Sequence, residues 1–361
     1  MEIFKTMTEL DHEQLVFCRE PGIGYRGLIA IHNTVLGPAL GGTRYWQYQS
    51  EQEAVVDALR LARGMTYKAA VAGLSLGGGK SVILMDPKVT DREAVFRAHG
   101  RFVESLKGRY ITAEDVGTSP ADMDYIHLET RHVVGLQGKS GDPSPVTAMG
   151  VYQGIKASAG WKLGSEDLTG RTVVVQGCGH VGYYLCKYLA AEGAKLVVTD
   201  IAQDKVRQVV DEFRARAVKP EEIYGLEADI FAPCALGAVV NDQTLPQFKV
   251  KVIAGGANNV LAEPRHGDAL EQKGILYAPD YVINAGGLIN VNSELMGWSA
   301  ERALRKAAEI HDTMLRVFEL AKSEKLPTYQ AADRLAERRI AMAMQLKRAW
   351  VGYSARREGD R

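Results

Sequence analysis

The chain has 361 residues and no formal net charge, because 44 lysines and arginines balance 44 aspartates and glutamates. Hydrophobic residues make up 46% and charged residues 24% of it, which excludes a disordered or disulfide-dense protein, and at roughly 150 residues per domain the length indicates two domains. The neutral balance argues against a nucleic-acid partner, and without about 18 consecutive apolar residues or a signal-peptide pattern we expect no membrane association and a cytoplasmic location.

The first part of the chain alternates between strand and helix patterns. In chain order the predicted elements are a strand at 28–31, a helix at 50–73, a strand at 81–85, a helix running through 96–103 and a strand at 110–113. Capping boxes mark the start of both helices, formed by Ser50 with Glu53 and by Thr90 with Glu93. We expect residues 1–140 to form an α/β domain.

A Gly/Pro/Ser-rich segment, KSGDPSP at 139–145, predicts a hinge, with Ser144 as the N-cap and Pro145 as the first residue of a new helix. Beyond the hinge, short apolar strands alternate with helix-length segments. The predicted strands lie at 172–176, 195–200, 229–233 and 251–254. Such alternation predicts a parallel, doubly wound sheet in residues 141–330.

The C-terminal part of the sequence has an amphipathic helical pattern from Ser299 to about Ala349, with a break at Pro327. We expect its last helices, at about 330–361, to pack back onto the first domain and tie the two domains together.

The most specific local motif is GCGHVG, a complete GxGxxG formed by Gly177, Cys178, Gly179, His180, Val181 and Gly182. It follows the predicted strand TVVVQ and opens a helix, and Asp200 closes the next strand. This context predicts a Rossmann-type dinucleotide site rather than a glycine turn that binds nothing. Asp200 would accept hydrogen bonds from a ribose and repel a 2′-phosphate, so NAD is favoured over NADP.

Polar residues of the first domain form a second candidate site. Lys68 and Lys80 stand in apolar and glycine-rich segments, where lysine is uncommon, and Asp115 follows a strand. The lysines could face a small anion, one holding a carboxylate and the other acting as a base, or they could be ordinary solvated cations. Asp115 could be a catalytic carboxylate on a loop or a turn residue.

Two other classes of site have weaker signals. Gly79-Lys80-Ser81 resembles the end of a phosphate-binding loop, but Leu74 occupies the position of the required first glycine, and the element order is helix before strand. The cysteines stand far apart without a CxxC pair, and the eight histidines include no HExxH pair. We therefore expect neither a triphosphatase nor a metal site, and mostly buried, reduced thiols.

Five motifs, in their order and spacing, resemble the glutamate/leucine/phenylalanine/valine dehydrogenase family. These are PALGGTR at 38–44, MTYK at 65–68, GGGK at 77–80, AEDVG at 113–117 and NAGG at 284–287. The resemblance extends over nearly the whole chain and is strongest to the members that act on leucine. It implies reversible, NAD-dependent oxidative deamination of L-leucine and other branched-chain L-amino acids to 2-oxo acids and ammonia, in the cleft between the domains.

The same resemblance assigns roles to the candidate residues. Lys68 would bind the substrate carboxylate with the backbone of Gly41 and Gly42, Lys80 would be the base that activates water, and Asp115 would exchange protons with the amino nitrogen. Further residues implied at the substrate are Leu40, Met65, Ala113, Asn259, Leu288 and Val291, and further residues implied at the nicotinamide are Thr147 and Asn284.

The expected substrate pocket is apolar, which disfavours glutamate because a buried, unpaired carboxylate is costly. Leu288 stands where the resemblance leads us to expect valine, and the added methylene could tilt the preference toward valine. The bulk of Leu40 argues against phenylalanine. Phenylalanine or valine dehydrogenase activity and, remotely, a non-catalytic NAD-sensing role remain as alternatives, and the resemblance implies a homo-octamer.

Overall fold

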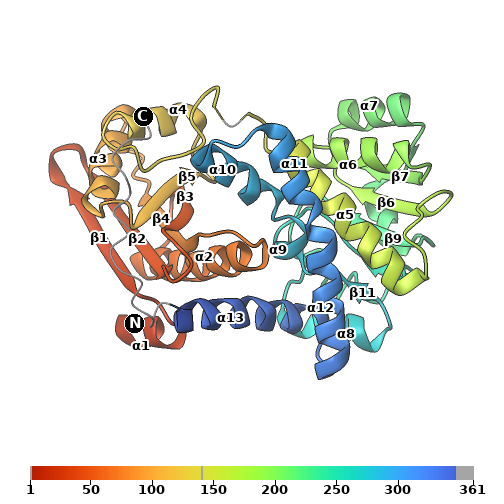
Figure 1. Ribbon diagram of the computed structural model, residues 1–361. Coiled ribbons are helices and arrows are strands. Elements are labelled where there is room, and N and C mark those ends of the chain that lie inside the picture. The colour runs from red at the N-terminus through yellow and green to blue at the C-terminus, as the bar shows by residue number, and fades with distance from the viewer. Residues whose placement is uncertain (1, 140, 347–361) are drawn as a thin grey trace.

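The computed structural model describes residues 2–139 and 141–346, which form two α/β halves side by side (Figure 1). None of the helices in this described part is long and apolar enough to cross a membrane. The first half contains α1 (Ile3–Glu9), β1 (Gln14–Glu20), β2 (Tyr25–Asn33), β3 (Ala39–Trp46), α2 (Glu51–Val71), β4 (Gly77–Leu84), α3 (Arg92–Ser105), β5 (Tyr110–Glu114) and α4 (Pro120–His127).

The first half is built on a mixed five-stranded sheet in the order β1-β2-β4-β3-β5. β2 is antiparallel to β1 and β4, whereas β3 is parallel to both β4 and β5. Because β3 lies between β4 and β5, residues at the ends of these three parallel strands are brought to one edge of the sheet.

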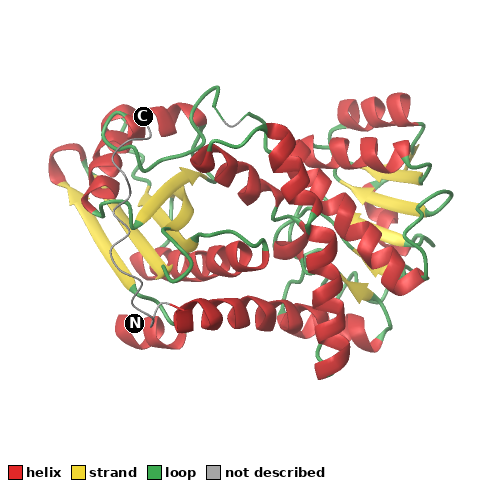
Figure 2. Ribbon diagram, in the orientation of Figure 1, coloured by secondary structure: helices red, strands yellow, loops and turns green. Residues whose placement is uncertain are grey.

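The second half begins with α5 (Ser144–Leu163) and contains a parallel six-stranded sheet in the order β11-β10-β9-β6-β7-β8. Its strands and their connecting helices are β6 (Thr172–Gln176), α6 (His180–Ala191), β7 (Lys195–Thr199), α7 (Gln203–Phe213), β8 (Arg216–Ala217), β9 (Ile230–Pro233), β10 (Val252–Ile253), α8 (Pro264–Gln272) and β11 (Leu276–Tyr277). Helices cover both faces of this sheet (Figure 2), so the predicted doubly wound architecture is confirmed. The strand order is that of the Rossmann fold, whose ligands bind where the order reverses, here between β6 and β9.

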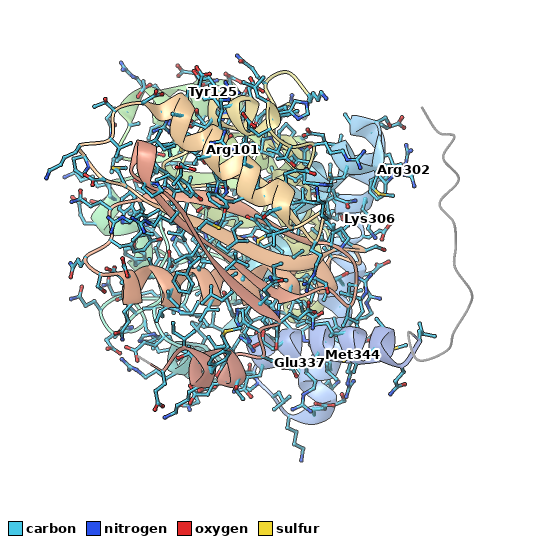
Figure 3. The ribbon with its side chains drawn as sticks, turned by 90° about the vertical axis from the view of Figure 1, so that its left-hand side faces the viewer. Arg101, Tyr125, Arg302, Lys306, Glu337 and Met344 are labelled. Atoms are coloured by element: carbon cyan, nitrogen blue, oxygen red, sulfur yellow. The ribbon has the colours of Figure 1, made fainter. Side chains whose placement is uncertain are left out.

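The chain then returns toward the first half through α9 (Asp280–Ile283), α10 (Gly286–Met296), α11 (Ala300–Ala308), α12 (Ile310–Glu324) and α13 (Thr328–Leu346). Helix α13 lies along α2, where Arg339 donates hydrogen bonds to the carbonyls of Ala70 and Leu74 at 2.6 and 3.0 Å. From the side of the first half, α13 with Glu337 lies below the sheet (Figure 3). The part of the predicted tail at 347–361 falls outside the described residues.

Several predicted boundaries were wrong by a few residues. The N-cap of α3 is Asp91, not Thr90, because the Asp91 carboxylate accepts the N–H of Ala94 at 2.9 Å. Helix α5 begins at Ser144 itself, whose N–H is held by Asp142 at 2.9 Å, so Ser144 is not its N-cap. The tail is also broken at Glu309, between α11 and α12, in addition to the predicted break at Pro327.

Strand β4 starts four residues before the predicted strand at 81–85 and includes the three glycines. A Cβ on Gly77 would lie 1.9 Å from the carbonyl oxygen of Asn33, and a Cβ on Gly78 would lie 2.1 Å from the backbone nitrogen of Thr66. The glycines are therefore needed because β2 and α2 approach the strand closely, a tertiary requirement that strand propensity does not record.

Candidate active site

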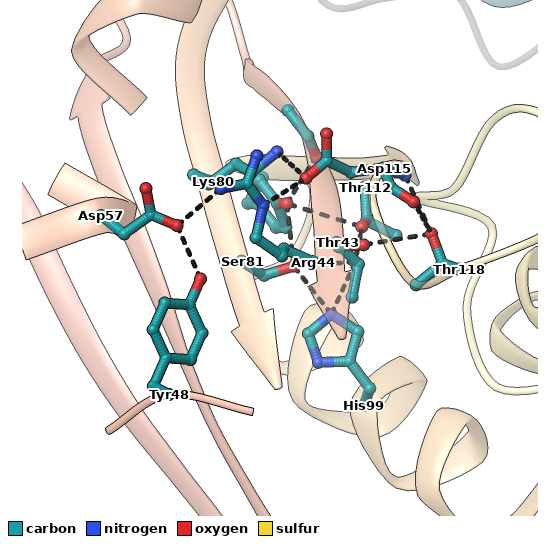
Figure 4. A network of polar contacts seen from close by, with 12 residues as sticks. Thr43, Arg44, Tyr48, Asp57, Lys80, Ser81, His99, Thr112, Asp115 and Thr118 are labelled. Carbon is teal, nitrogen blue, oxygen red and sulfur yellow. Dashed lines mark hydrogen bonds and ion pairs between the residues drawn. The ribbon is translucent and has the colours of Figure 1, made fainter. Parts of the chain in front are cut away.

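Lys80 and Asp115 form an ion pair over the first sheet, in which Lys80 is buried and Asp115 is partly exposed (Figure 4). Lys80 lies on β4 with only 5% of its side chain exposed, and its Nζ is 2.8 Å from Oδ2 of Asp115, in the loop after β5. Arg44, on β3 between them, donates from Nε to the same oxygen at 2.9 Å. Thus β3 and β4 each supply one cation to a carboxylate in the loop after β5.

The surroundings shift the protonation of both groups. Burial lowers the pKa of Lys80, although the carboxylate of Asp115 acts in the opposite direction. Burial alone would raise the pKa of Asp115, but the charges of Lys80 and Arg44 outweigh it, so this pKa is lowered. The site therefore holds an ionised carboxylate beside an amine that loses its proton more readily than an exposed lysine.

Beneath this pair lies a fixed polar network. The hydroxyl of Thr43 bonds Oγ of Ser81 at 2.7 Å and Nε2 of His99 at 3.1 Å, which joins β3, β4 and α3. Burial lowers the pKa of His99 to about 3, so the ring is neutral at ordinary pH. The network thus supports Lys80 from below without adding charge.

Lys68 lies in the last turn of α2, facing the second half of the molecule. Its Nζ is 3.4 Å from Oδ1 of Asn258. Burial lowers the pKa of Lys68 to about 8; Asp280 opposes this shift, and the positive charge of Lys80 adds to it. Because each lysine lies within the other's electrostatic reach, the two can act on one small anionic ligand.

Sequence reasoning missed Asn258, which joins the two halves of the site. Its Oδ1 accepts hydrogen bonds from Lys68 Nζ and, at 2.8 Å, from Nδ2 of Asn284. The predicted neighbour, Asn259, is an exposed residue with left-handed backbone (φ 52°). The doublet Asn258-Asn259 after β10 was the available signal, and only the backbone shows which side chain turns toward Lys68.

Gly41 and Gly42 lie on β3 next to the ion pair. A Cβ on Gly41 would lie 1.7 Å from the carbonyl oxygen of Gly79, and a Cβ on Gly42 would lie 2.7 Å from Cβ of Asp115. Tyr110 donates a hydrogen bond to the carbonyl of Gly41 at 2.6 Å. The two glycines therefore let β3 pass close to β4 and Asp115, with their backbone fixed.

The residues predicted to surround the substrate side chain come from both halves. Leu40, Ala113 and Leu288 belong to the large buried apolar core that runs through both halves, and Met65 and Val291 pack against this core. Leu40 comes from β3, Ala113 from β5, and Leu288 from α10. The polar site thus lies beside an apolar wall to which both halves contribute.

The glycine turn has the geometry that a dinucleotide site requires. Gly177 has φ 102°, and a Cβ on Gly182 would lie 1.9 Å from the carbonyl oxygen of Gly177, so the helix packs tightly on the strand. A Cβ on Gly179 would meet nothing within 4 Å, which leaves this stretch of backbone open for a ligand. The turn opens α6, whose first N–H groups are free to bind an anion.

The side chains near this turn differ in orientation. Oδ2 of Asp200 accepts the N–H of Cys178 at 2.7 Å, and its Oδ1 accepts the N–H of Ala202 at 2.9 Å, so the carboxylate is fixed beside the turn. The Cys178 side chain is buried, and burial raises its pKa to about 12; Val181 is half-buried and His180 is exposed. Cys178 therefore contributes its backbone, and not its side chain, to the glycine turn.

Asn284 and Thr147 lie where α5, α10 and the segment after β10 meet. Oδ1 of Asn284 is buried and has no hydrogen-bond partner among the described residues. Thr147, on α5, lies close to α10, since its Oγ1 would be 3.2 Å from a Cβ on Gly287. An unpaired buried oxygen is costly, and the N–H of a nicotinamide carboxamide would satisfy it, so these residues fit the predicted cofactor.

The structure excludes the phosphate-binding loop. Gly79, Lys80 and Ser81 are all inside strand β4, whereas that motif forms a loop between a strand and a helix. The four cysteines are all free. Among the described residues, Asp242, Glu263 and His266 form a possible metal cluster, but Arg265 already binds both carboxylates at 2.7 and 2.9 Å.

Two family models together match almost the whole chain. The model described as Glu/Leu/Phe/Val dehydrogenase, dimerisation domain, matches residues 12–132, and the model described as Glutamate/Leucine/Phenylalanine/Valine dehydrogenase matches residues 138–348.

Three relatives show the extent of the similarity. A leucine dehydrogenase from Geobacillus stearothermophilus is 60% identical over 94% of each chain. A phenylalanine dehydrogenase from Bacillus thermotolerans is 48% identical over 94% of this chain and 90% of its own. The crystal structure of L-tryptophan dehydrogenase from Nostoc punctiforme superimposes with a TM-score of 0.88 at 47% identity, over 95% of this chain and 99% of that one.

Proposed function

Because the chain belongs to the glutamate/leucine/phenylalanine/valine dehydrogenase family, we propose that it is an NAD-dependent leucine dehydrogenase. It would convert L-leucine and other branched-chain L-amino acids reversibly to 2-oxo acids and ammonia. The observation that carries this proposal is the juxtaposition of two lysines with lowered pKa values, an ionised Asp115 and an apolar wall.

Each side chain of the site has a chemical task in this reaction. NAD⁺, held by the glycine turn, Asp200, Thr147 and Asn284, supplies the hydride acceptor when bound. The Lys68 ammonium would hold the substrate carboxylate beside the Gly41-Gly42 backbone, which leaves Lys80 for the chemistry.

Lys80 and Asp115 would carry out the proton transfers. Lys80, as a neutral amine, would take a proton from the water that attacks the iminium carbon of the substrate. Asp115 would exchange a proton with the departing amino nitrogen, and its charge stabilises the cation that develops there.

The pocket favours branched aliphatic side chains. Leu40, Ala113, Leu288 and Val291 offer no charge to pair a second carboxylate, and leaving one unpaired in such a wall would cost several kcal/mol. Leu288 on α10 and Leu40 on β3 are both buried and bulky, and side chains of this size at the pocket would limit the room for an aromatic ring.

A panel of L-amino acids assayed with NAD⁺ tests the proposal. We expect kcat/KM for leucine, valine and isoleucine to exceed that for phenylalanine and tryptophan at least about tenfold, which corresponds to about 1.4 kcal/mol. The absorbance of the reduced nicotinamide measures turnover. A preference for an aromatic amino acid, or no turnover of any amino acid by the purified protein, would contradict it.

Cofactor preference rests on Asp200, followed by Ile201, an exposed residue without charge. Replacing Asp200 by Ser together with Ile201→Arg removes the charge that repels a 2′-phosphate and adds a cation to bind it. We expect the ratio of kcat/KM for NADP⁺ over NAD⁺ to rise by about tenfold or more. Ile201→Arg alone is the matched control, and an unchanged ratio in the double variant would show that Asp200 does not bind the ribose.

We also propose that the protein is a cytoplasmic homo-octamer. The match of the first half to a model described as a dimerisation domain supports self-association of the chain, and the octamer is what the resemblance to the family implies.

A further inference from the structure

We propose that Arg44 is a positioning residue for this reaction: its guanidinium holds the Asp115 carboxylate at the oxygen shared with Lys80, and Asp57 with Tyr48 holds Arg44 in place. This inference rests on the proposed deamination, because it assigns Arg44 a task only through the two residues that would transfer protons.

The first observation is the sharing of one carboxylate oxygen. Oδ2 of Asp115 receives Nε of Arg44 at 2.9 Å and Nζ of Lys80 at 2.8 Å. Within the described part of the chain, Oδ1 of Asp115 accepts no hydrogen bond, so it is available to a substrate nitrogen. Two donors on one oxygen fix the orientation of the carboxylate and direct its other oxygen elsewhere (Figure 4).

The second observation is that Arg44 is itself held on its far side. A second nitrogen, Nη1, donates to Oδ2 of Asp57 on α2 at 2.7 Å, and the hydroxyl of Tyr48 donates to the same oxygen at 2.6 Å. A planar guanidinium bonded at both ends to carboxylates has little freedom to rotate. Arg44 therefore ties the position of the Asp115 side chain to β3 and α2.

The Asp115 backbone is fixed separately, so the side chain is what Arg44 controls. Oγ1 of Thr118 accepts the Asp115 N–H at 2.8 Å, and the Thr118 hydroxyl also lies 2.8 Å from the carbonyl of Asp115. Arg44 and Asp115 are each about one-fifth exposed, and loss of Arg44 leaves Asp115 paired with Lys80 at 2.8 Å. Loss of Arg44 should accordingly disturb turnover more than folding.

Charge supports the same assignment. The charges that act on Lys80 are those of Asp115 after β5, Arg44 on β3, and Asp57 and Lys68 on α2. Two further titratable groups, Tyr110 on β5 and His99 on α3, bond the neighbouring Ser81. Burial lowers the pKa of Lys80 most; the charge of Arg44 lowers it further, and that of Asp57 raises it. Arginine keeps its proton at all ordinary pH values, so the charge of Arg44 always opposes the rise in the pKa of Lys80 that Asp115 causes.

The test compares Arg44→Gln with Asp57→Asn in the full-length enzyme, on leucine or on the best amino acid of the panel. We expect Arg44→Gln to lower kcat by about 10- to 100-fold with little change in KM, because Asp115 loses its orientation. In a plot of kcat against pH, the limb along which activity rises should move to higher pH in Arg44→Gln. The reason is that the pKa of Lys80 rises when the positive charge of Arg44 is removed. The same limb should move to lower pH in Asp57→Asn, which removes a charge that raises the pKa of Lys80.

Opposite shifts of the two pH profiles indicate a positioning role. A general structural defect would instead lower both the activity and the Tm in both variants, without shifting their pH profiles in opposite directions. If Arg44→Gln does not fold, Arg44→Lys keeps the charge but cannot make both contacts, and should show the lower kcat with a nearly unchanged profile. Wild-type kcat and profile in these variants, or shifts in the same direction, would overturn the assignment. Loss of leucine turnover in the wild type would instead overturn the proposed function.

A rescue experiment gives an independent readout. Arg44 borders a surface hollow of about 640 Å³ that is also lined by Trp46, Tyr48, Asp57 and Val116. Millimolar guanidinium should therefore reach the space left in Arg44→Ala and restore part of kcat, whereas Lys80→Ala should not respond to it. Absence of rescue in a folded Arg44→Ala variant would count against the proposal.

Discussion

Replacement of Lys80 by alanine is expected to lower kcat for leucine by about 10²- to 10⁴-fold, the range that a positioned acid or base contributes. Lys80 is a buried amine with a lowered pKa, and its Nζ lies 2.8 Å from Oδ2 of Asp115. The dinucleotide turn lies in the other half of the molecule, so the affinity for NAD⁺ should stay nearly unchanged. Steady-state kinetics with leucine and fluorescence titration with the reduced cofactor measure the two quantities.

Lys68→Ala is the matched control, because it removes the other lysine of the pair. Lys68 faces Asn258 rather than Asp115, and its proposed task is binding. We expect it mainly to raise KM for leucine, whereas Lys80→Ala mainly lowers kcat. Substantial residual deamination in Lys80→Ala, or an unchanged KM in Lys68→Ala, would remove that lysine from its role.

Asp115→Asn is the second change with a large expected effect. Asparagine has nearly the same shape but cannot take up a proton at ordinary pH, so kcat should fall by about 10²- to 10⁴-fold. The carboxylate also raises the pKa of Lys80, so its removal lowers that pKa. The rising limb of the residual activity should therefore move to lower pH, which a kcat profile over pH measures.

Glu114→Gln is the control for this variant, since Glu114 is the exposed carboxylate next in the chain. It should leave kcat and the Tm close to wild type. A loss in Asp115→Asn no greater than that in Glu114→Gln would show that the Asp115 charge has no part in the reaction.

The parts of the fold that were predicted correctly are specified by neighbouring residues in the chain. The glycine turn is an example, because strand, turn and helix follow one another, and Gly177 and Gly182 are needed within that short span. The parallel strands around it were also predicted well. A strand buried on both faces is a continuous apolar run, as in Thr172–Gln176.

The parts that were missed depend on contacts between distant segments. Strands β1 and β3 were not predicted. Strand β4 was predicted to start too late because its glycines are required by the close approach of Asn33 and Thr66, which are distant in the chain. Asn258 and Arg44 are ordinary polar residues in sequence and gain a role only through their partners, Lys68 and Asp115. The predicted N-cap Ser50 is confirmed, since its hydroxyl accepts the N–H of Glu53 at 3.1 Å. The cap of α3 was predicted one residue away because adjacent Thr90 and Asp91 can both fill that position, and α5 has Pro143 at its N-cap.

The structure of the enzyme with NAD⁺ and the 2-oxo acid derived from leucine decides the role of Lys80 through the position of its Nζ. We expect this nitrogen within hydrogen-bond reach of the reacting carbonyl oxygen, at about 2.6–3.2 Å or through one water, with Lys68 at the carboxylate. A complex in which Lys80 Nζ faces solvent, away from the reacting carbon, would contradict it.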